Sequence, residues 1–362
     1  MTNREKEILD IIRQNPMIQQ NEIAELLDIT RSSVAVHITN LIKKGYVMGK
    51  GYVLKDESYI LVIGGANMDI QGKPETLLNM NDSNPGVVSI SAGGVGRNIA
   101  ENLSRMGART QLITALGNDS NGKRLMQECV EAGIDMHLST IFEDSSTSTY
   151  LSILDETGDM KVAIAHMDVF KKMTVNYIKK KHDAIKHASA ILIDTNLPQE
   201  TIEYLLNTYG DKPFFLDTVS TAKAKKVRDL MGKFHTIKPN KIEAEMLSGI
   251  AIKSAKDIEK AGAYFIDQGV KQVFISLGAE GLYYTNGAQK EFIKNPSVEI
   301  INATGAGDAF MAGLLFGYSQ QYSIEETARF AMMASAIAIN HENTINPNMS
   351  YDLIIERKKE FK

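Results

Sequence analysis

At the start of the chain, hydrophobic residues recur at the spacing of amphipathic helices. We expect helices over residues 5–14, 21–27 and 30–44. Asn15-Pro16 ends the first helix, and Thr30 is suited to cap the third. The expected apolar positions are Ile8, Leu9, Ile11 and Ile12, then Ile23, Leu26 and Leu27 facing inward, then Val34, Ile38, Leu41 and Ile42.

Residues 45–54 alternate in polarity and are broken by glycines, as in a small hairpin. Three helices followed by a hairpin resemble a winged helix-turn-helix module over residues 1–57. The resemblance implies that the third helix enters the major groove of duplex DNA. That helix would present Arg31, Ser32, Ser33, Ala35 and His37, with His37 as a surface contact. The alternative is a small three-helix domain used for docking or dimerisation.

From Tyr59 onward, after a short linker at residues 56–58, short apolar runs alternate with helical stretches. This alternation predicts a mostly parallel sheet with helices on both faces. Residues 70–91 and 147–164 interrupt the rhythm, and we expect them to form a β-lid over the carboxyl edge of the sheet. Strands are expected at residues 60–63, 111–115, 190–193, 214–216, 236–237 and 273–276.

Composition limits the classes of protein that fit this pattern. A length of 362 residues exceeds what one hydrophobic core usually serves, which agrees with two units. The net charge of −4 excludes a polycation that coats nucleic acid. Cys129 is the one cysteine, which excludes a disulfide framework and favours a small core residue in a reducing compartment. Since no apolar run is long enough to span a membrane, we expect a cytoplasmic protein without a membrane partner.

The segment from Asn302 to Phe310 carries the strongest chemical signal. Gly305, Ala306 and Gly307 let backbone N–H groups converge at a helix N-terminus, where the helix dipole also favours anions. A phosphoryl group in transfer spreads negative charge over its oxygens, and this nest would meet that charge. Asp308, at the rim, is placed to take the proton from an attacking hydroxyl. Gly-Ala-Gly alone is also compatible with a glycine turn capped by an ordinary aspartate.

Three further segments accompany this one. Gly64-Gly-Ala-Asn67-Met-Asp69 follows the first strand, Ser91–Ala100 opens a helix with a glycine pair, and Lys238–Glu245 follows another strand. In this order they resemble the ribokinase (PfkB-type) family of carbohydrate and nucleoside kinases, over residues 59–350. The resemblance implies a ribokinase-like three-layer α/β/α sandwich with a small β-lid over residues 58–362. It also implies an ATP-dependent phosphotransferase.

The resemblance assigns roles to residues on the acceptor side. Asp69 would hold sugar hydroxyls, with Asn67 nearby. Gly93, Gly94 and Asn98 would bind the sugar from the opposite side. Taken alone, an acid such as Asp69 would be read as a solvated surface residue.

The resemblance assigns other residues to the nucleotide side. Asn240 and Glu243 would organise Mg²⁺ through water at the ATP phosphates, since hard cations prefer oxygen ligands. Thr304 belongs to the same nucleotide site, Ser276 and Gly278 would lie along the nucleotide, and Asn343 would lie near the adenine. A monovalent cation such as K⁺ is a further candidate cofactor.

Smaller details concern the acceptor. Residues 81–86, 148–158 and 237–251 resemble those of the pseudouridine kinases, which phosphorylate the 5′-hydroxyl of that nucleoside. A uracil ring offers carbonyl and N–H groups, with which Ser83, Asn84, Thr149 and Asn196 are candidates to pair. For Ser83 and Asn84 the alternative is ordinary turn chemistry. Another nucleoside, or a pentose such as ribose, remains an alternative acceptor.

The N-terminal unit leaves a second class of function open, a transcription regulator that uses the kinase fold as a ligand sensor. Intact Asp308, Asn240 and Glu243 favour an active enzyme, and a bifunctional protein satisfies both readings. A homodimer is implied by the resemblance alone, since lids of this family often pair.

Overall fold

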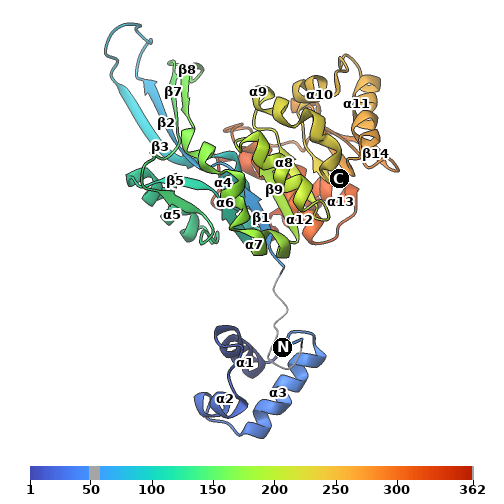
Figure 1. The fold of residues 1–362 in the computed structure, drawn as a ribbon. Helices are drawn as coiled ribbons and strands as arrows, with labels where there is room; N and C mark the ends of the chain where they lie inside the picture. The colour runs from blue at the N-terminus through green and yellow to red at the C-terminus, as the bar shows by residue number, and fades with distance from the viewer. Residues whose placement is uncertain (49–57, 361–362) are drawn as a thin grey trace. The chain divides into compact units, whose positions relative to one another are not determined.

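The computed structural model describes residues 1–48 and 58–360. Contacts between residues divide the chain into two units, Met1–Ser58 and Tyr59–Lys362 (Figure 1). In the described parts of the chain, no helix is both long enough and apolar enough to cross a membrane.

The N-terminal unit consists of α1 (Asn3–Gln14), α2 (Gln20–Leu26) and α3 (Arg31–Lys43). Thr2 and Glu5 form a capping box at α1, and the Thr30 hydroxyl accepts from the backbone N–H of Ser33 at 3.2 Å to begin α3. The expected hairpin lies outside the described residues from residue 49 on. The core residues of this unit are Ile8, Leu9, Ile12, Ile18, Ile23, Ala24, Val34, Ile38, Leu41 and Val47.

The prediction that Leu26 faces inward is wrong, because 66% of this residue is exposed. Ile23 and Ala24 take the buried positions of α2. At 3.6 residues per turn, Leu26 lies about 110° around the helix from the middle of that face, whereas Leu27 returns to it. Ile42, at the margin of the apolar stripe of α3, is also largely exposed.

The second unit is built on an eight-stranded sheet. Its strands, in spatial order, are β14 (Lys290–Ile293), β13 (Leu282–Thr285), β12 (Gln272–Ser276), β11 (Thr236–Ile237), β10 (Phe214–Asp217), β9 (Ala190–Asp194), β1 (Ile60–Ile63) and β4 (Thr110–Ile113). Every pairing from β4 to β12 is parallel, as predicted, while β13 and β14 pair antiparallel at one edge. All parallel strands therefore end at one edge, where ligands bind in open α/β sheets.

Helices cover both faces of this sheet. Along β1, Ile60 and Val62 enter one core, and Leu61 and Ile63 enter the other. The first core is closed by α4 (Val95–Arg105), α5 (Ser120–Glu131), α12 (Ala306–Ser319), α13 (Ile324–Ile339) and α14 (Tyr351–Glu360). The second is closed by η1 (Asp168–Lys172), α6 (Val175–Lys179), α7 (His182–His187), α8 (Gln199–Thr208), α9 (Thr221–Ala224), η2 (Lys225–Lys233), α10 (Lys241–Ser248) and α11 (Ala255–Asp267). Two three-residue strands, β5 (Ala115–Gly117) and β6 (Thr140–Phe142), and the short helix η3 (Gly278–Glu280) complete the unit.

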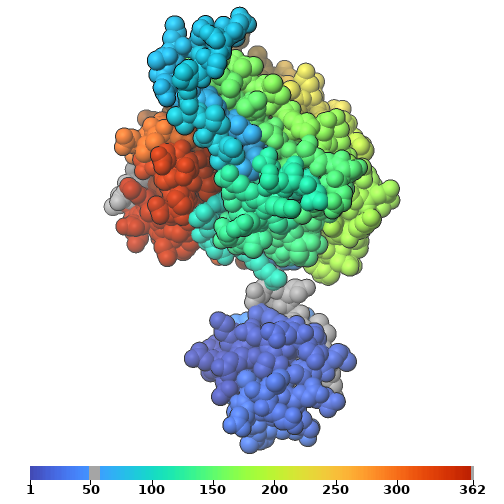
Figure 2. Space-filling model, turned by 90° about the vertical axis from the view of Figure 1, so that its left-hand side faces the viewer, coloured from blue at the N-terminus to red at the C-terminus, as the bar shows by residue number. Residues whose placement is uncertain are grey.

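The two segments predicted as a lid form a separate four-stranded sheet. Its order is β3 (Gly86–Gly93), β2 (Asn67–Pro74), β7 (Thr149–Leu154) and β8 (Met160–His166). The β2–β3 hairpin projects from the surface of the unit (Figure 2). Because side chains alternate across a strand, one lid face is apolar and the other polar. The apolar face carries Ile70, Val88, Ile90, Leu151, Ile153, Val162 and Ile164, and the polar face carries Asp69, Gln71, Ser89, Ser91, Tyr150 and Ser152.

Candidate active site

The first turn of α12 has the geometry predicted for an anion-binding nest. Gly305 caps the helix in the left-handed region, with φ of +83°. A Cβ atom at this position would lie 2.3 Å from the carbonyl oxygen of Thr344, so the close approach of two loops also requires glycine. The amide of Asn302 shapes the approach by accepting from the backbone N–H of Thr304 at 2.9 Å. The backbone N–H groups that begin α12 are left for a ligand, as at other helix N-termini.

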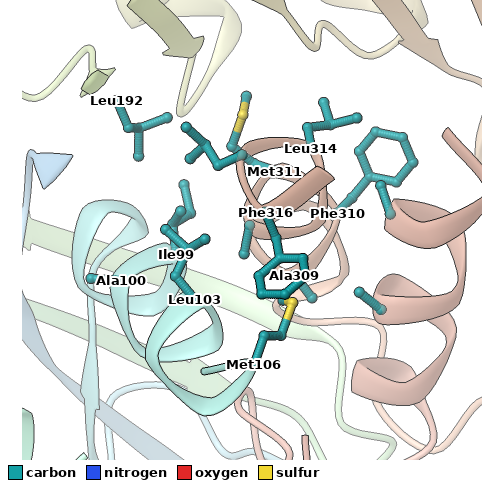
Figure 3. Packing of buried hydrophobic residues seen from close by; sticks show 14 of the residues in the cluster. Ile99, Ala100, Leu103, Met106, Leu192, Ala309, Phe310, Met311, Leu314 and Phe316 are labelled. Carbon is teal, nitrogen blue, oxygen red and sulfur yellow. The ribbon is translucent and has the colours of Figure 1, made fainter. Parts of the chain in front are cut away.

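Helix α4 packs against α12 (Figure 3). This packing brings the segment Ser91–Ala100, which contains the glycine pair, close to the first turn of α12. Ile99 and Leu103 of α4 lie in the same buried cluster as Ala309 and Met311 of α12. Small residues on α12 allow close packing on its other side too, since a Cβ atom at Gly313 would lie 2.5 Å from the Cα of Ala331.

This packing joins the predicted base to a predicted sugar-binding residue. The Asn98 amide Nδ2 donates to Asp308 Oδ2 at 2.9 Å. Asp308 is half-buried. The pKa of Asp308 is raised to about 7: burial and then the neighbouring Asp217 carboxylate raise it, while the Asn98 bond and the Lys238 charge oppose both. A carboxyl group titrating near neutrality is suited to act as a general base.

Lys238 and Asp217 were not predicted from the sequence as site residues. Lys238 Nζ lies 3.6 Å from Asp217 Oδ2, and both side chains are largely buried. A Cβ atom built on Gly307 would lie 3.2 Å from Lys238 Nζ, so the ammonium group lies beside the nest. Asp217 ends β10 and Lys238 directly follows β11, which places them at the carboxyl edge of the sheet.

The residues predicted to bind the acceptor lie at the start of β2 and the end of β3. Asn67 Nδ2 donates to Asp69 Oδ1 at 2.6 Å. Gly93 lies opposite, where a Cβ atom would lie 2.1 Å from Asp69 Oδ2. Gly94 begins α4 with φ of +99°, and its own Cβ would lie 2.6 Å from the carbonyl oxygen of Gly65. Burial raises the pKa of Asp69, while the Asn67 amide and the Arg97 charge lower it. The structure thus brings these four residues together.

Asp194 holds the two glycine segments in place, a role that the sequence did not indicate. The fully buried carboxylate of Asp194 accepts from the backbone N–H groups of Gly65 at 2.7 Å and Gly96 at 3.1 Å. It also accepts from Asn196 Nδ2 at 3.1 Å. Lys223 Nζ donates to Asn196 Oδ1 at 2.6 Å, so both ends of the Asn196 amide are engaged.

Asn240 and Glu243 form a capping box at α10. Asn240 Oδ1 accepts from the N–H of Glu243, and Glu243 Oε2 accepts from the N–H of Asn240, each at 2.9 Å. Asn240 is exposed, while 7% of Glu243 is exposed. A β-bridge joins Asn240 to Ser276, so two predicted nucleotide-site residues lie next to each other. Carboxylate and amide oxygens of this kind suit a hydrated Mg²⁺.

A cavity of about 760 Å³ connects several predicted residues. Its lining includes Asp69, Thr304 and Asn343, together with the polar face of the lid and the charged flank of α4. Ser276 and Gly278 do not line it; they lie at the end of β12 and the start of η3, where Asn295 Nδ2 donates to the Gly278 carbonyl at 2.7 Å.

The four residues predicted to pair with a uracil ring do not line this cavity, and neither do Asn67, Gly93, Gly94 and Asn98. Ser83 and Asn84 lie between β2 and β3, where Asn84 Oδ1 accepts from the N–H of Asn79 at 2.7 Å. That bond agrees with turn chemistry. Thr149 is paired with Met68, so the pleat directs it to the lid face opposite Asp69. Asn196 is engaged beside Asp194.

On α3, Arg31 and Ser32 are exposed, and Ser33 is half-buried. His37 was expected at the surface, but it is half-buried and its Nδ1 is enclosed with no hydrogen-bond partner in the described part of the chain. Val36 and Thr39, which were not predicted as contacts, are exposed on the same helix.

Comparisons with known proteins agree with this geometry. The family model for pfkB family carbohydrate kinases matches residues 57–350, and a winged helix-turn-helix DNA-binding model matches residues 1–48. The chain is 39% identical to the uncharacterized sugar kinase YeiI of Escherichia coli (strain K12), over 97% of this chain and 98% of that protein. It is 38% identical to pseudouridine kinase of the same organism, over 83% of this chain and 97% of that protein. A solved carbohydrate kinase from Agrobacterium tumefaciens is 30% identical with a TM-score of 0.75, over 84% of this chain and 97% of that one.

The fold and the site define a phosphotransferase that acts on an alcohol group. The chain belongs to the pfkB family of carbohydrate kinases. The predicted family and the predicted ribokinase-like α/β fold are therefore confirmed. The similarity to YeiI spans 353 residues of the 362, so it extends through the N-terminal unit.

Proposed function

We propose that the second unit transfers the γ-phosphoryl group of ATP to the 5′-hydroxyl of pseudouridine, giving pseudouridine 5′-phosphate and ADP. The observation that carries the proposal is the position of Asp308. Asp308 lies in the first turn of α12 and accepts a hydrogen bond from Asn98. The segment that contains Asn98 also contains Gly93, which lies against Asp69. A base and an anion-binding nest next to hydroxyl-binding side chains are the elements of phosphoryl transfer.

The residues of this chain would act as follows. Asp69 and Asn67 hold the sugar hydroxyls, and the ionised Asp308 accepts the proton of the attacking hydroxyl. The N–H groups at the start of α12 stabilise charge that develops on the transferred group, and Lys238 adds a positive charge beside Gly307. Positioning and electrostatics supply most of the catalysis in this class.

The residues present fit ATP and Mg²⁺. The loop of Thr344 can approach the start of α12 only because Gly305 has no Cβ, the backbone N–H groups there suit phosphate oxygens, and the oxygens of Asn240 and Glu243 are hard ligands. Bound Mg²⁺ would neutralise phosphate charge there. Thr304, Ser276, Gly278 and Asn343 would contact the nucleotide, and K⁺ remains a candidate cofactor.

Two observations favour a nucleoside over a bare pentose. The relative named pseudouridine kinase is matched over nearly its whole length. The polar lid face also adds hydrogen-bonding groups beyond Asp69, notably Gln71, Tyr150 and Ser152, inside one cavity of a size common for small-molecule sites. A base with carbonyl and N–H edges would find partners there.

The test is ADP release with pseudouridine, uridine, adenosine and ribose, each with and without a Mg²⁺ chelator. We expect pseudouridine to give the largest kcat/KM and the chelator to abolish turnover. Asp308→Asn should lower kcat by about a hundredfold to ten-thousandfold while nucleoside binding is kept. Asp229→Asn, at an exposed acid, serves as the control. A larger kcat/KM for ribose or adenosine would refute the proposed acceptor.

We also propose that the N-terminal unit binds duplex DNA, because its sequence matches a DNA-binding model and α3 exposes Arg31, Ser32 and Lys43. A homodimer and a cytoplasmic location stay predictions.

A further inference from the structure

A guanidinium group lies buried beside the acceptor site. Arg97, in the first turn of α4, is 6% exposed. Its Nη1 donates to Asn98 Oδ1 at 3.1 Å and to the carbonyl oxygen of Ala92 at 3.3 Å. Its Nη2 contacts the carboxylate of Glu101, which is also buried. The proposed mechanism gives this side chain no role.

The contact with Arg97 settles the orientation of the Asn98 amide. Arginine has five donors and no acceptor, so the amide must present its oxygen to Arg97. The amide nitrogen then points to Asp308, as the 2.9 Å bond between them records. An amide rotated by half a turn would place its oxygen against the carboxylate of Asp308 and its nitrogen against the guanidinium group. Both contacts would then be repulsive.

Arg97 is itself held by a chain of ion pairs. Glu101 also pairs with Arg105, whose Nε donates to Glu101 Oε1 at 2.8 Å. Arg105 Nη1 donates to the carbonyl oxygen of Pro347 at 2.9 Å. Pro347 belongs to the same loop as Thr344, which lies against Gly305. This series of contacts therefore links that loop to Asn98, and Arg97 is held on one side by Glu101 and on the other by Asn98.

We propose that Arg97 is a positioning residue that fixes the Asn98 amide with its N–H₂ group toward Asp308, and so holds the base in place. The inference rests on the proposed function. It deepens that function by assigning Arg97 the control of the protonation of the base.

The groups that face Asp308 set the sign of the effect. Asp217 at the end of β10 and Asp194 at the end of β9 favour the protonated form of Asp308, while Lys238 after β11 and the Asn98 amide on α4 favour the ionised form. When Arg97 no longer holds the Asn98 amide, one of the two contributions that favour the ionised form of Asp308 is lost. The pKa of Asp308 then rises, and a higher pH is needed to ionise the base.

The experiment measures kcat/KM for the acceptor against pH, since this parameter reports the groups of the free enzyme. In Arg97→Met we expect the acidic limb to move up by about one pH unit, a roughly tenfold loss on the acidic side that largely recovers at alkaline pH. Arg97→Lys keeps a positive charge beside Glu101 and serves as a second variant in case Arg97→Met does not fold. It should shift the acidic limb in the same direction. Arg329→Met removes a half-exposed arginine paired with Glu325 on α13 and should leave the limb unchanged.

A double-mutant cycle separates positioning from a direct charge effect. In an Asn98→Ala background, we expect Arg97→Met to produce no further shift of the acidic limb. An equal shift in both backgrounds would overturn the inference, as would an unshifted limb in Arg97→Met and Arg97→Lys. Failure of the proposed function looks different, because it appears in the wild-type protein, either as a larger kcat/KM for ribose or adenosine or as no ADP release with any acceptor.

Discussion

Asn98 and Asp308 are 210 positions apart in the chain and are joined by a hydrogen bond of 2.9 Å between Nδ2 and Oδ2. The bond exists because α4 and α12 pack side by side on one face of the sheet. It connects the segment proposed to hold the acceptor to the segment proposed to form the anion nest.

Activity should depend on the ionisation of Asp308. The pKa of Asp308 is raised to about 7, chiefly by burial, and in the proposed mechanism this residue acts in its ionised form. We therefore expect kcat/KM to fall about tenfold per pH unit below that value and to level off above it. The measurement is ADP release between pH 5 and 9 at saturating ATP. A flat profile down to about pH 5 would contradict the assignment of Asp308 as the base.

The same burial should cost stability. The folded protein holds the Asp308 proton from pH 3.8 to about 7, whereas the unfolded chain releases it, so stability is lost as pH rises through this window. Asp308→Asn avoids the loss. We expect the free energy of unfolding of Asp308→Asn to increase relative to that of the wild-type protein by up to about 2 kcal/mol between pH 5.5 and 8.5. Thermal unfolding at both pH values measures this, and Asp229→Asn should show no such growth.

Gly305 and Gly107 offer a matched pair of substitutions. Both have positive φ, +83° and +90°, but a Cβ atom at Gly305 would meet the Thr344 carbonyl oxygen, while one at Gly107 would meet nothing within 4 Å. Gly107→Ala should therefore cost about 1–2 kcal/mol of stability from backbone strain alone and leave kcat near normal. Gly305→Ala should cost more stability and lower kcat at least about tenfold by displacing the nest. Equal kcat values for the two variants would contradict the nest.

The N-terminal unit should bind duplex DNA through charge. For the full-length chain, we expect affinity for a random duplex to fall linearly on a plot of log K against log salt. Arg31→Ala with Lys43→Ala should reduce the slope by about one per lost phosphate contact. Lys171→Ala, at an exposed lysine of the kinase unit, is the control. Absence of binding at low salt would leave the docking interpretation of this unit.

The parallel strands were predictable because each is a short, buried apolar run at regular intervals along the chain. The edge strands β13 and β14 were not, since their antiparallel pairing depends on two tight turns. In the turn before β13 the N–H of Leu277 donates to the carbonyl of Gly281 at 2.9 Å, and in the turn before β14 the N–H of Asn286 donates to the carbonyl of Gln289 at 3.1 Å. Such a turn carries little hydrophobic periodicity. The inward prediction for Leu26 failed for a related reason: seven residues define a helical face poorly.

The motif residues were predictable as a set, but their neighbours were not. Asp194 and Asp217 each end an apolar strand, which was a usable signal at the carboxyl edge of a parallel sheet. Arg97 gave no such signal, because an arginine in a first helical turn is usually exposed; here its Nη2 contacts Glu101 and its Nη1 donates to Asn98. Thr149 was misplaced because one step along a strand reverses the face.

The capping box of Asn240 and Glu243 has a consequence for tracing the history of such proteins. These two side chains begin α10 whatever else they bind, and replacing a capping asparagine by alanine typically costs about 1 kcal/mol. A descendant that had lost its chemistry and kept only ligand sensing would still be selected to retain both. Asp308 differs from them, because burial makes its charged form costly to keep. Its presence in a related chain is therefore a better sign of enzymatic activity than the presence of Asn240 or Glu243.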